Sequence, residues 1–83
     1  MAYEIEFGLT LQALRLKQNL SQSELSKLSH LDRTFISLLE RGIRQPSLTT
    51  VFQLAFALKI KPSELVIKVE NRVRRSRWNR LKT

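Results

Sequence analysis

The chain is 83 residues long, which suits one small domain and leaves too little interior for a roomy catalytic cleft. It has no cysteine, no apolar run near the ~20 residues of a membrane helix, and no apolar core between Met1 and Phe7; we therefore expect a cytoplasmic protein without disulfides, thiolate metal sites, membrane span or signal peptide. The net charge of +8 is uneven, because residues 68–83 hold seven Lys and Arg against one acid, and so basic an end favours a polyanionic partner.

The spacing of apolar residues predicts five helices and no strands, which is an all-α fold. The first helix is expected over about residues 7–18, because Phe7, Leu11 and Leu14 recur on one face at helical intervals. Asn19 is expected to end it, since asparagine tolerates positive φ better than most residues.

The next two helices form a tight corner. Ser21 and Glu24 have the spacing of a capping box, which predicts the start of the second helix. Asp32 is predicted to cap the third helix over residues 33–41. Two short helices joined by so short a turn predict a helix-turn-helix, whose second helix lies in the major groove of DNA.

Ser47 is predicted to cap a fourth helix over residues 48–58, and Pro62 suits the first turn of the fifth. A helix-turn-helix domain with a dimerising last helix is expected over residues 1–71. Residues 72–83 form a basic tail, which is either a helical extension or a disordered end. The residues of the third and fourth helices expected in the core are Ile36, Leu39, Val51, Leu54, Ala55 and Leu58.

The run L-R-x-x-x-x-L-S-Q-x-E-L-S, followed by L-D-R-T-F-I-S-L-L-E-R-G and P-S-L, resembles the Xre/lambdoid-repressor helix-turn-helix family. The resemblance covers residues 9–66. Within it, L-D-R-T-F-I-S is most similar to the controller proteins of restriction–modification systems and to short stand-alone Xre regulators. Three residues depart from the family pattern: His30 and Lys59 stand where glycine is common, and Phe56 where a charged residue is usual.

The resemblance implies a compact five-helix, lambda-repressor-like domain that forms a homodimer through its last helix and binds inverted-repeat operators. It implies that Gln22 meets the DNA backbone and that Arg15 and Glu40 form a structural salt bridge. The positions that it implies to face DNA bases are Arg33, Thr34, Ser37 and Leu38.

The residue types at these positions also suit contact with DNA. Arg33 could pair bidentately with guanine, and a loop arginine such as Arg44 could meet phosphate, although a solvated face is the alternative. The expected backbone-contacting set is Ser21, Gln22, Arg41, Arg44 and Gln45. His30 is the only histidine, and no nucleophile pair or cofactor motif is present; neither catalysis nor a metal or other cofactor is expected.

Apolar residues exceed what a five-helix core needs, which favours a dimer interface. The residues predicted for it are Phe56, Val66, Val69 and Val73. The tail, residues 72–83, could track phosphates, extend the dimer helix or dock a protein partner. The leading hypothesis is a homodimeric, sequence-specific transcriptional regulator of double-stranded DNA. The alternative is an antitoxin or protein-interaction module that acts through the tail and the exposed apolar face.

Overall fold

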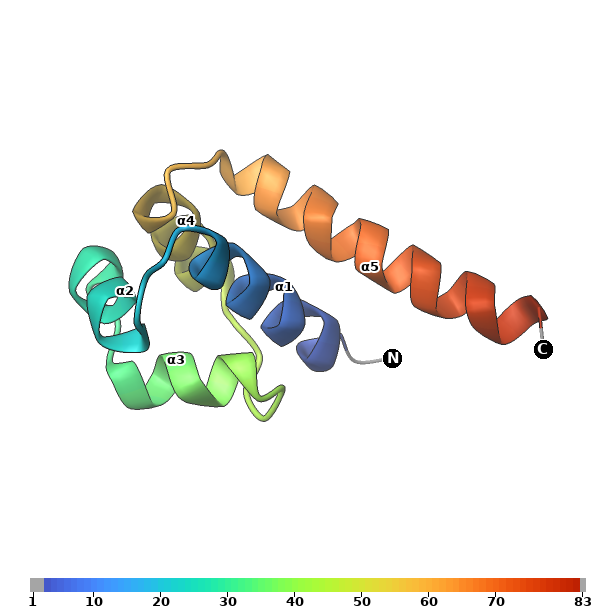
Figure 1. Ribbon diagram of the computed structural model, residues 1–83, viewed down its shortest axis with the longest axis horizontal. Coiled ribbons are helices and arrows are strands. Elements are labelled where there is room, and N and C mark those ends of the chain that lie inside the picture. The colour runs from blue at the N-terminus through green and yellow to red at the C-terminus, as the bar shows by residue number, and fades with distance from the viewer. Residues whose placement is uncertain (1–2, 83) are drawn as a thin grey trace.

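A computed structural model describes residues 3–82 of the chain, with side chains through Ser76. The backbone of these residues forms five helices and no strand, which confirms the all-α fold (Figure 1). The helices are α1 (Glu4–Lys17), α2 (Gln22–Ser29), α3 (Arg33–Glu40), α4 (Leu48–Ala57) and α5 (Pro62–Lys82). Within residues 3–82 no helix is both long and apolar enough to cross a membrane.

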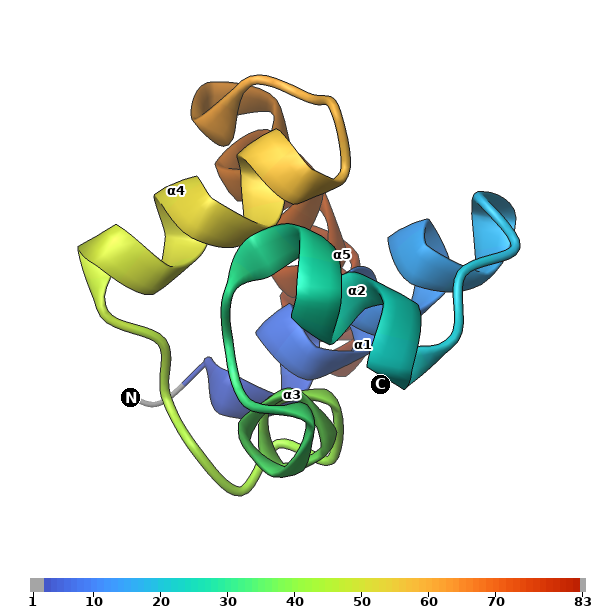
Figure 2. The ribbon, with the colours of Figure 1, turned by 90° about the vertical axis from the view of Figure 1, so that its left-hand side faces the viewer.

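Helix α1 lies at the centre of the molecule. It packs against α3 on one side and against α5 on the other, while α2 and α4 close the remaining end (Figure 1). Turned by 90°, the molecule presents α3 end-on at one edge, below α2 and α4 (Figure 2). The helix that should read DNA is therefore at the periphery, and its position is set by α1 and α2.

The core contains the side chains that helical spacing predicts. Leu11, Leu25 and Leu65 are fully buried, and Phe7 and Leu14 lie beside them. The buried set expected on α3, on α4 and at residue 58 is confirmed in full: Ile36, Leu39, Val51, Leu54, Ala55 and Leu58. Leu20 and Leu31 pack against this core from the two turns that flank α2.

The helix ends follow local chemistry. Ser21 and Glu24 form the predicted capping box, in which the Ser21 hydroxyl accepts from the Glu24 N–H and the Glu24 carboxylate accepts from the Ser21 N–H. Ser47 caps α4 by accepting from the Thr50 N–H. Asn19 lies two residues after the end of α1 and has the expected positive φ, 59°.

Two expectations about helix ends need correction, and for the tail the expectation held two alternatives. Helix α1 begins at Glu4 rather than residue 7, because Glu4 and Glu6 suit the positive end of the helix dipole although they add nothing to the apolar pattern. Asp32 occupies the N-cap of α3, but its side chain makes no capping hydrogen bond. The basic tail continues α5 as helix to Lys82, which is the helical alternative; the side chain of Trp78 lies outside the described residues.

Candidate nucleic-acid interface

The turn between α2 and α3 is held by several hydrogen bonds. His30 adopts the left-handed conformation, with φ of 60°, and so fills the position where glycine is common. The Ser26 hydroxyl donates to the Leu31 carbonyl, and the Gln53 amide donates to the Ser29 carbonyl over 3.3 Å. The turn is therefore tied both to itself and to α4.

A buried ion pair links α1 to the end of α3. Arg15 and Glu40 are 8% and 7% exposed, and the Arg15 Nε donates to Glu40 Oε2 over 2.6 Å. A second bond runs from Arg15 Nη2 to Glu40 Oε1 over 3.0 Å, which makes the pair bidentate. Hydrogen bonding to Glu40 is the main cause that raises the pKa of Arg15, against the opposing effect of burial.

The same carboxylate reaches α2. The Gln22 side-chain amide donates to Glu40 Oε1 over 3.0 Å, and Arg15 Nη1 donates to the Leu20 carbonyl over 2.8 Å. One network therefore joins α1, the turn after it, the start of α2 and the end of α3. It fixes the angle between the two helices of the motif. The sequence indicated the Arg15–Glu40 pair through the resemblance, but the part played by Gln22 in this network was missed.

Helix α3 exposes one side at its N-terminal half. Arg33 and Thr34 are exposed, whereas Ser37 and Leu38 are half-buried. Ile36 on the opposite face is fully buried. Of the four predicted base-facing residues, Arg33 and Thr34 therefore project into solvent together, whereas Ser37 and Leu38 lie closer to the body of the protein.

The predicted backbone-contacting residues are less uniform. Arg41, Arg44 and Gln45 are exposed at the end of α3 and in the loop after it. Ser21 is exposed but engaged in its capping box, and Gln22 is half-buried with its amide nitrogen already bonded to Glu40. These two are consequently less free for phosphate than the other three.

Sequence reasoning also missed a contact that orients one of these cations. The Arg44 guanidinium lies over the Phe35 ring, 6.0 Å from its centroid. Phe35 is half-buried against the core, so it anchors the loop cation beside α3. Nine residues separate the two, across a helix end and a loop, and no sequence spacing marks such a pair.

The four residues predicted for a dimer interface line two different grooves. Val66, Val69 and Val73 line a groove of about 280 Å³ together with Tyr3. Phe56 lines a different groove, between α2 and α4, although its ring meets the edge of Phe52 at a centroid distance of 6.0 Å.

Phe52 lies between the groove of Phe56 and the groove of Val66. Its ring contacts Phe56, and it lines a further apolar groove together with Val66. We call this connected surface the apolar face. It consists of Tyr3, Leu48, Phe52, Val66, Ile67, Val69 and Val73. Leu48, which is 72% exposed, and Tyr3 were not predicted to belong to it, because their place depends on how α4 and the start of the chain lie against α5.

The five helices, with α3 exposed as the second helix of the helix-turn-helix, agree with what comparison to known proteins shows. A family model described as Helix-turn-helix matches residues 11–65. The chain belongs to the Xre-like helix-turn-helix family. This is a family of DNA-binding transcription regulators.

Three relatives illustrate the membership. The control protein C.BamHI of Bacillus amyloliquefaciens is 39% identical over 61 residues, which are 72% of this chain and 75% of that protein. The uncharacterised HTH-type transcriptional regulator y4dJ of Sinorhizobium fredii is 37% identical over 59 residues, or 71% and 77% of the two chains. The crystal structure of the restriction–modification controller protein C.AhdI from Aeromonas hydrophila superposes with a TM-score of 0.72 at 45% identity, covering 75% of this chain and 94% of that one.

Proposed function

We propose that this helix-turn-helix protein is a sequence-specific transcriptional regulator that binds an inverted-repeat operator as a homodimer. The exposed N-terminal half of α3 carries the proposal, because Arg33 and Thr34 project from a helix whose other end is locked by Glu40. A rigid helix with exposed polar side chains at its first turn can present donors to base edges. The backbone then loses little conformational entropy on binding, because the helix is already ordered.

The apolar face supports the two-fold symmetry of this proposal. Val66 and Phe52 are 52% and 43% exposed, and a contiguous apolar surface of this kind on a small domain marks an interface. In the proposed dimer the two α3 helices would enter successive major grooves, which lie about 34 Å apart. The operator would then mirror the symmetry of the protein.

The deciding experiment is selection of bound sequences from a random duplex pool with the full chain. We expect a palindromic consensus whose half-sites lie about one helical turn apart, or a multiple of that. Enrichment of a single, non-repeated site would contradict the homodimer, and the absence of enrichment would contradict sequence-specific binding altogether.

Replacing Arg33 with Ala tests direct base reading. If Arg33 contacts a guanine edge, Arg33→Ala should cost about 1–3 kcal/mol on the selected operator and little on random duplex of equal length. Fluorescence anisotropy at fixed salt would measure both. Arg41→Ala, at an exposed position at the end of the same helix, is the control and should weaken the two duplexes alike. Equal losses for Arg33→Ala on both duplexes would assign Arg33 to the backbone instead.

A further inference from the structure

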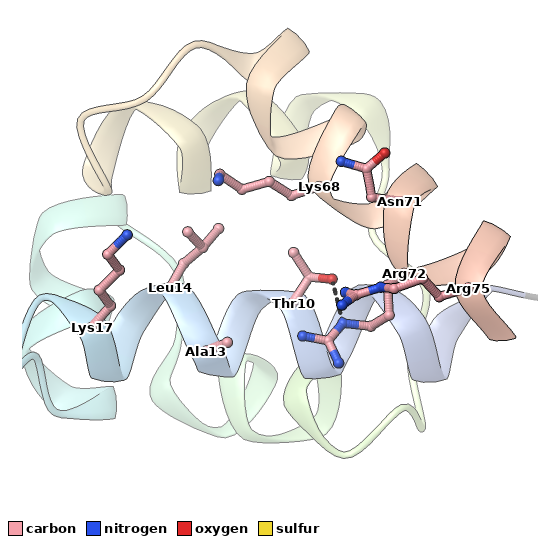
Figure 3. Close-up of a pocket in the computed structure, with 8 residues that line it drawn as sticks. All are labelled: Thr10, Ala13, Leu14, Lys17, Lys68, Asn71, Arg72 and Arg75. Carbon is pink, nitrogen blue, oxygen red and sulfur yellow. Dashed lines mark hydrogen bonds between the residues drawn. The ribbon is translucent and has the colours of Figure 1, made fainter.

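A groove between α1 and α5 is lined by cations from both helices and by no acidic side chain (Figure 3). Its volume is about 290 Å³. The four cations are Lys17, Lys68, Arg72 and Arg75. In Figure 3 the two arginines reach from α5 toward Thr10 of α1, while Lys17 and Lys68 lie at the other end of the groove. Asn71 adds an amide to the same wall.

No described acidic side chain forms an ion pair with these four cations. Among the side chains of residues 3–76, the only ion pair is the one between Arg15 and Glu40. Glu70, the nearest acid in sequence, lines the groove on the other flank of α5, with Tyr3. Four like charges that share one small concavity repel each other, and they concentrate the potential that attracts an anion.

One of the cations is held in position. The Arg72 Nε donates to the Thr10 hydroxyl over 3.2 Å, and that hydroxyl donates in turn to the Glu6 carbonyl over 2.8 Å. Thr10 is buried, at 3% exposed, so the anchor is part of the folded body. With Nε engaged, the two terminal nitrogens of Arg72 have no partner among the described side chains, and such a fork matches a phosphoryl group bidentately.

We propose that this groove binds a small molecule that carries two or more phosphoryl groups. About 290 Å³ is the capacity of a small-ligand site. A chain of phosphoryl groups delivers several negative charges within that volume, whereas an acidic peptide offers about one carboxylate per residue. A duplex seated on the exposed side of α3 would not cover the groove, because α1 lies between α3 and α5 (Figure 1). The site is therefore separate from the DNA interface.

The test uses the full-length protein and inorganic tripolyphosphate, titrated calorimetrically at constant ionic strength without DNA. We expect saturable binding of one ligand per chain, together with a rise in the melting temperature. Lys68→Gln and Arg72→Gln should each weaken binding by about tenfold or more, since each removes a charge-assisted contact. Lys61→Gln and Arg74→Gln remove the same charge from exposed positions outside the groove, and each should change the affinity by less than about twofold.

Several outcomes would overturn the proposal. Equal losses in all four variants would indicate general screening by a basic protein, and sulfate binding as tightly as tripolyphosphate would remove the need for several phosphoryl groups. If tripolyphosphate does not saturate, while Lys68→Gln and Arg72→Gln weaken binding to duplex DNA or to an acidic peptide, the groove belongs to that partner. Because Lys68 is exposed, Lys68→Gln keeps the test valid even if Arg72→Gln folds poorly.

Discussion

Glu40 is the residue whose removal should be felt most widely. It accepts two hydrogen bonds from Arg15 and one from Gln22 in a site that is almost closed to water. A buried charge that loses its partner keeps the full cost of its desolvation, which exceeds the net value of the intact pair. The network joins α1, the start of α2 and the end of α3 through this one carboxylate.

We predict that Glu40→Ala lowers the free energy of unfolding by about 3–5 kcal/mol, because it strands the Arg15 guanidinium. Urea denaturation followed by circular dichroism would measure the change. The double variant Arg15→Met with Glu40→Leu should recover most of the loss, since it removes both charges and keeps the volume. A single variant that costs less than about 1 kcal/mol would show that water reaches the pair.

Glu24 links the capping box to pH. Its hydrogen bond from the Ser21 backbone N–H, helped by the Ser21 side chain, holds the pKa of the Glu24 carboxyl below its usual range. The native state thus favours the carboxylate, while the unfolded chain takes up its proton near the ordinary value of about 4.3. This contribution is complete above the unfolded pKa and is lost as the pH falls through the lower folded pKa.

We therefore predict that the stability difference between the natural protein and Glu24→Gln is constant near neutral pH and shrinks once the pH falls below about 4. The midpoints of urea unfolding, measured for both proteins from about pH 7 to pH 2.5, would show this trend. A difference that stays the same down to the lowest pH would mean that the capping carboxylate is no better bound in the folded state than in the unfolded one.

At the scale of elements, α1 crosses the end of α3 with its backbone in close contact. A Cβ added to Gly8 would lie 2.3 Å from the Leu39 carbonyl oxygen and 2.6 Å from that of Glu40. Both are backbone atoms, so neither can rotate away. Glycine at this position permits α1 to lie directly on the backbone of α3, which brings Arg15 within reach of Glu40.

Gly8→Ala should consequently destabilise the protein by about 1–3 kcal/mol or more, through forced separation of the two helices. The sign of the change in unfolding free energy is informative, because Gly→Ala in an unhindered helix interior stabilises the helix by up to about 1 kcal/mol. Thermal or urea unfolding would give the value. Ala13→Gly, at an exposed position of α1, is the matched control and should cost no more than helix propensity, about 1 kcal/mol. A stabilised Gly8→Ala protein would refute the close crossing.

On the scale of the whole molecule, α5 has two unlike flanks. One flank contributes Val66, Val69 and Val73 to the apolar face, and the other contributes Lys68, Arg72 and Arg75 to the cationic groove. The helix also extends beyond the body of the protein to Lys82 (Figure 1). A single long helix therefore separates an apolar surface suited to a second copy from a charged one suited to an anion.

Placing a charge on the apolar flank should break the proposed dimer. We predict that Val66→Glu converts the protein to a monomer and weakens binding to a two-site operator by at least about tenfold, since two linked half-sites would become independent. Sedimentation equilibrium and anisotropy would measure the two effects. Leu16→Glu, at a position 56% exposed but outside the apolar face, should remain dimeric. Retention of the dimer in Val66→Glu would place the interface elsewhere.

Much of the local structure could be predicted from the sequence, because its causes lie within a few residues of each other. The capping box of Ser21 and Glu24, the cap at Ser47 and the left-handed residue Asn19 each depend on hydrogen bonds or backbone sterics inside one turn. Helical periodicity likewise identified the buried side of α3 and α4. The family resemblance then indicated which exposed residues should meet DNA, an assignment that stays a prediction.

What only the tertiary structure decided are the contacts between distant segments. Eighteen residues separate Gln22 from Glu40, and sixty-two separate Thr10 from Arg72. No periodicity reports whether two such side chains meet, because that depends on the crossing of the helices that carry them. For the same reason the sequence showed a basic end and an apolar stripe on α5, but only the packing of α5 on α1 turned one flank into a cationic groove and left the other open.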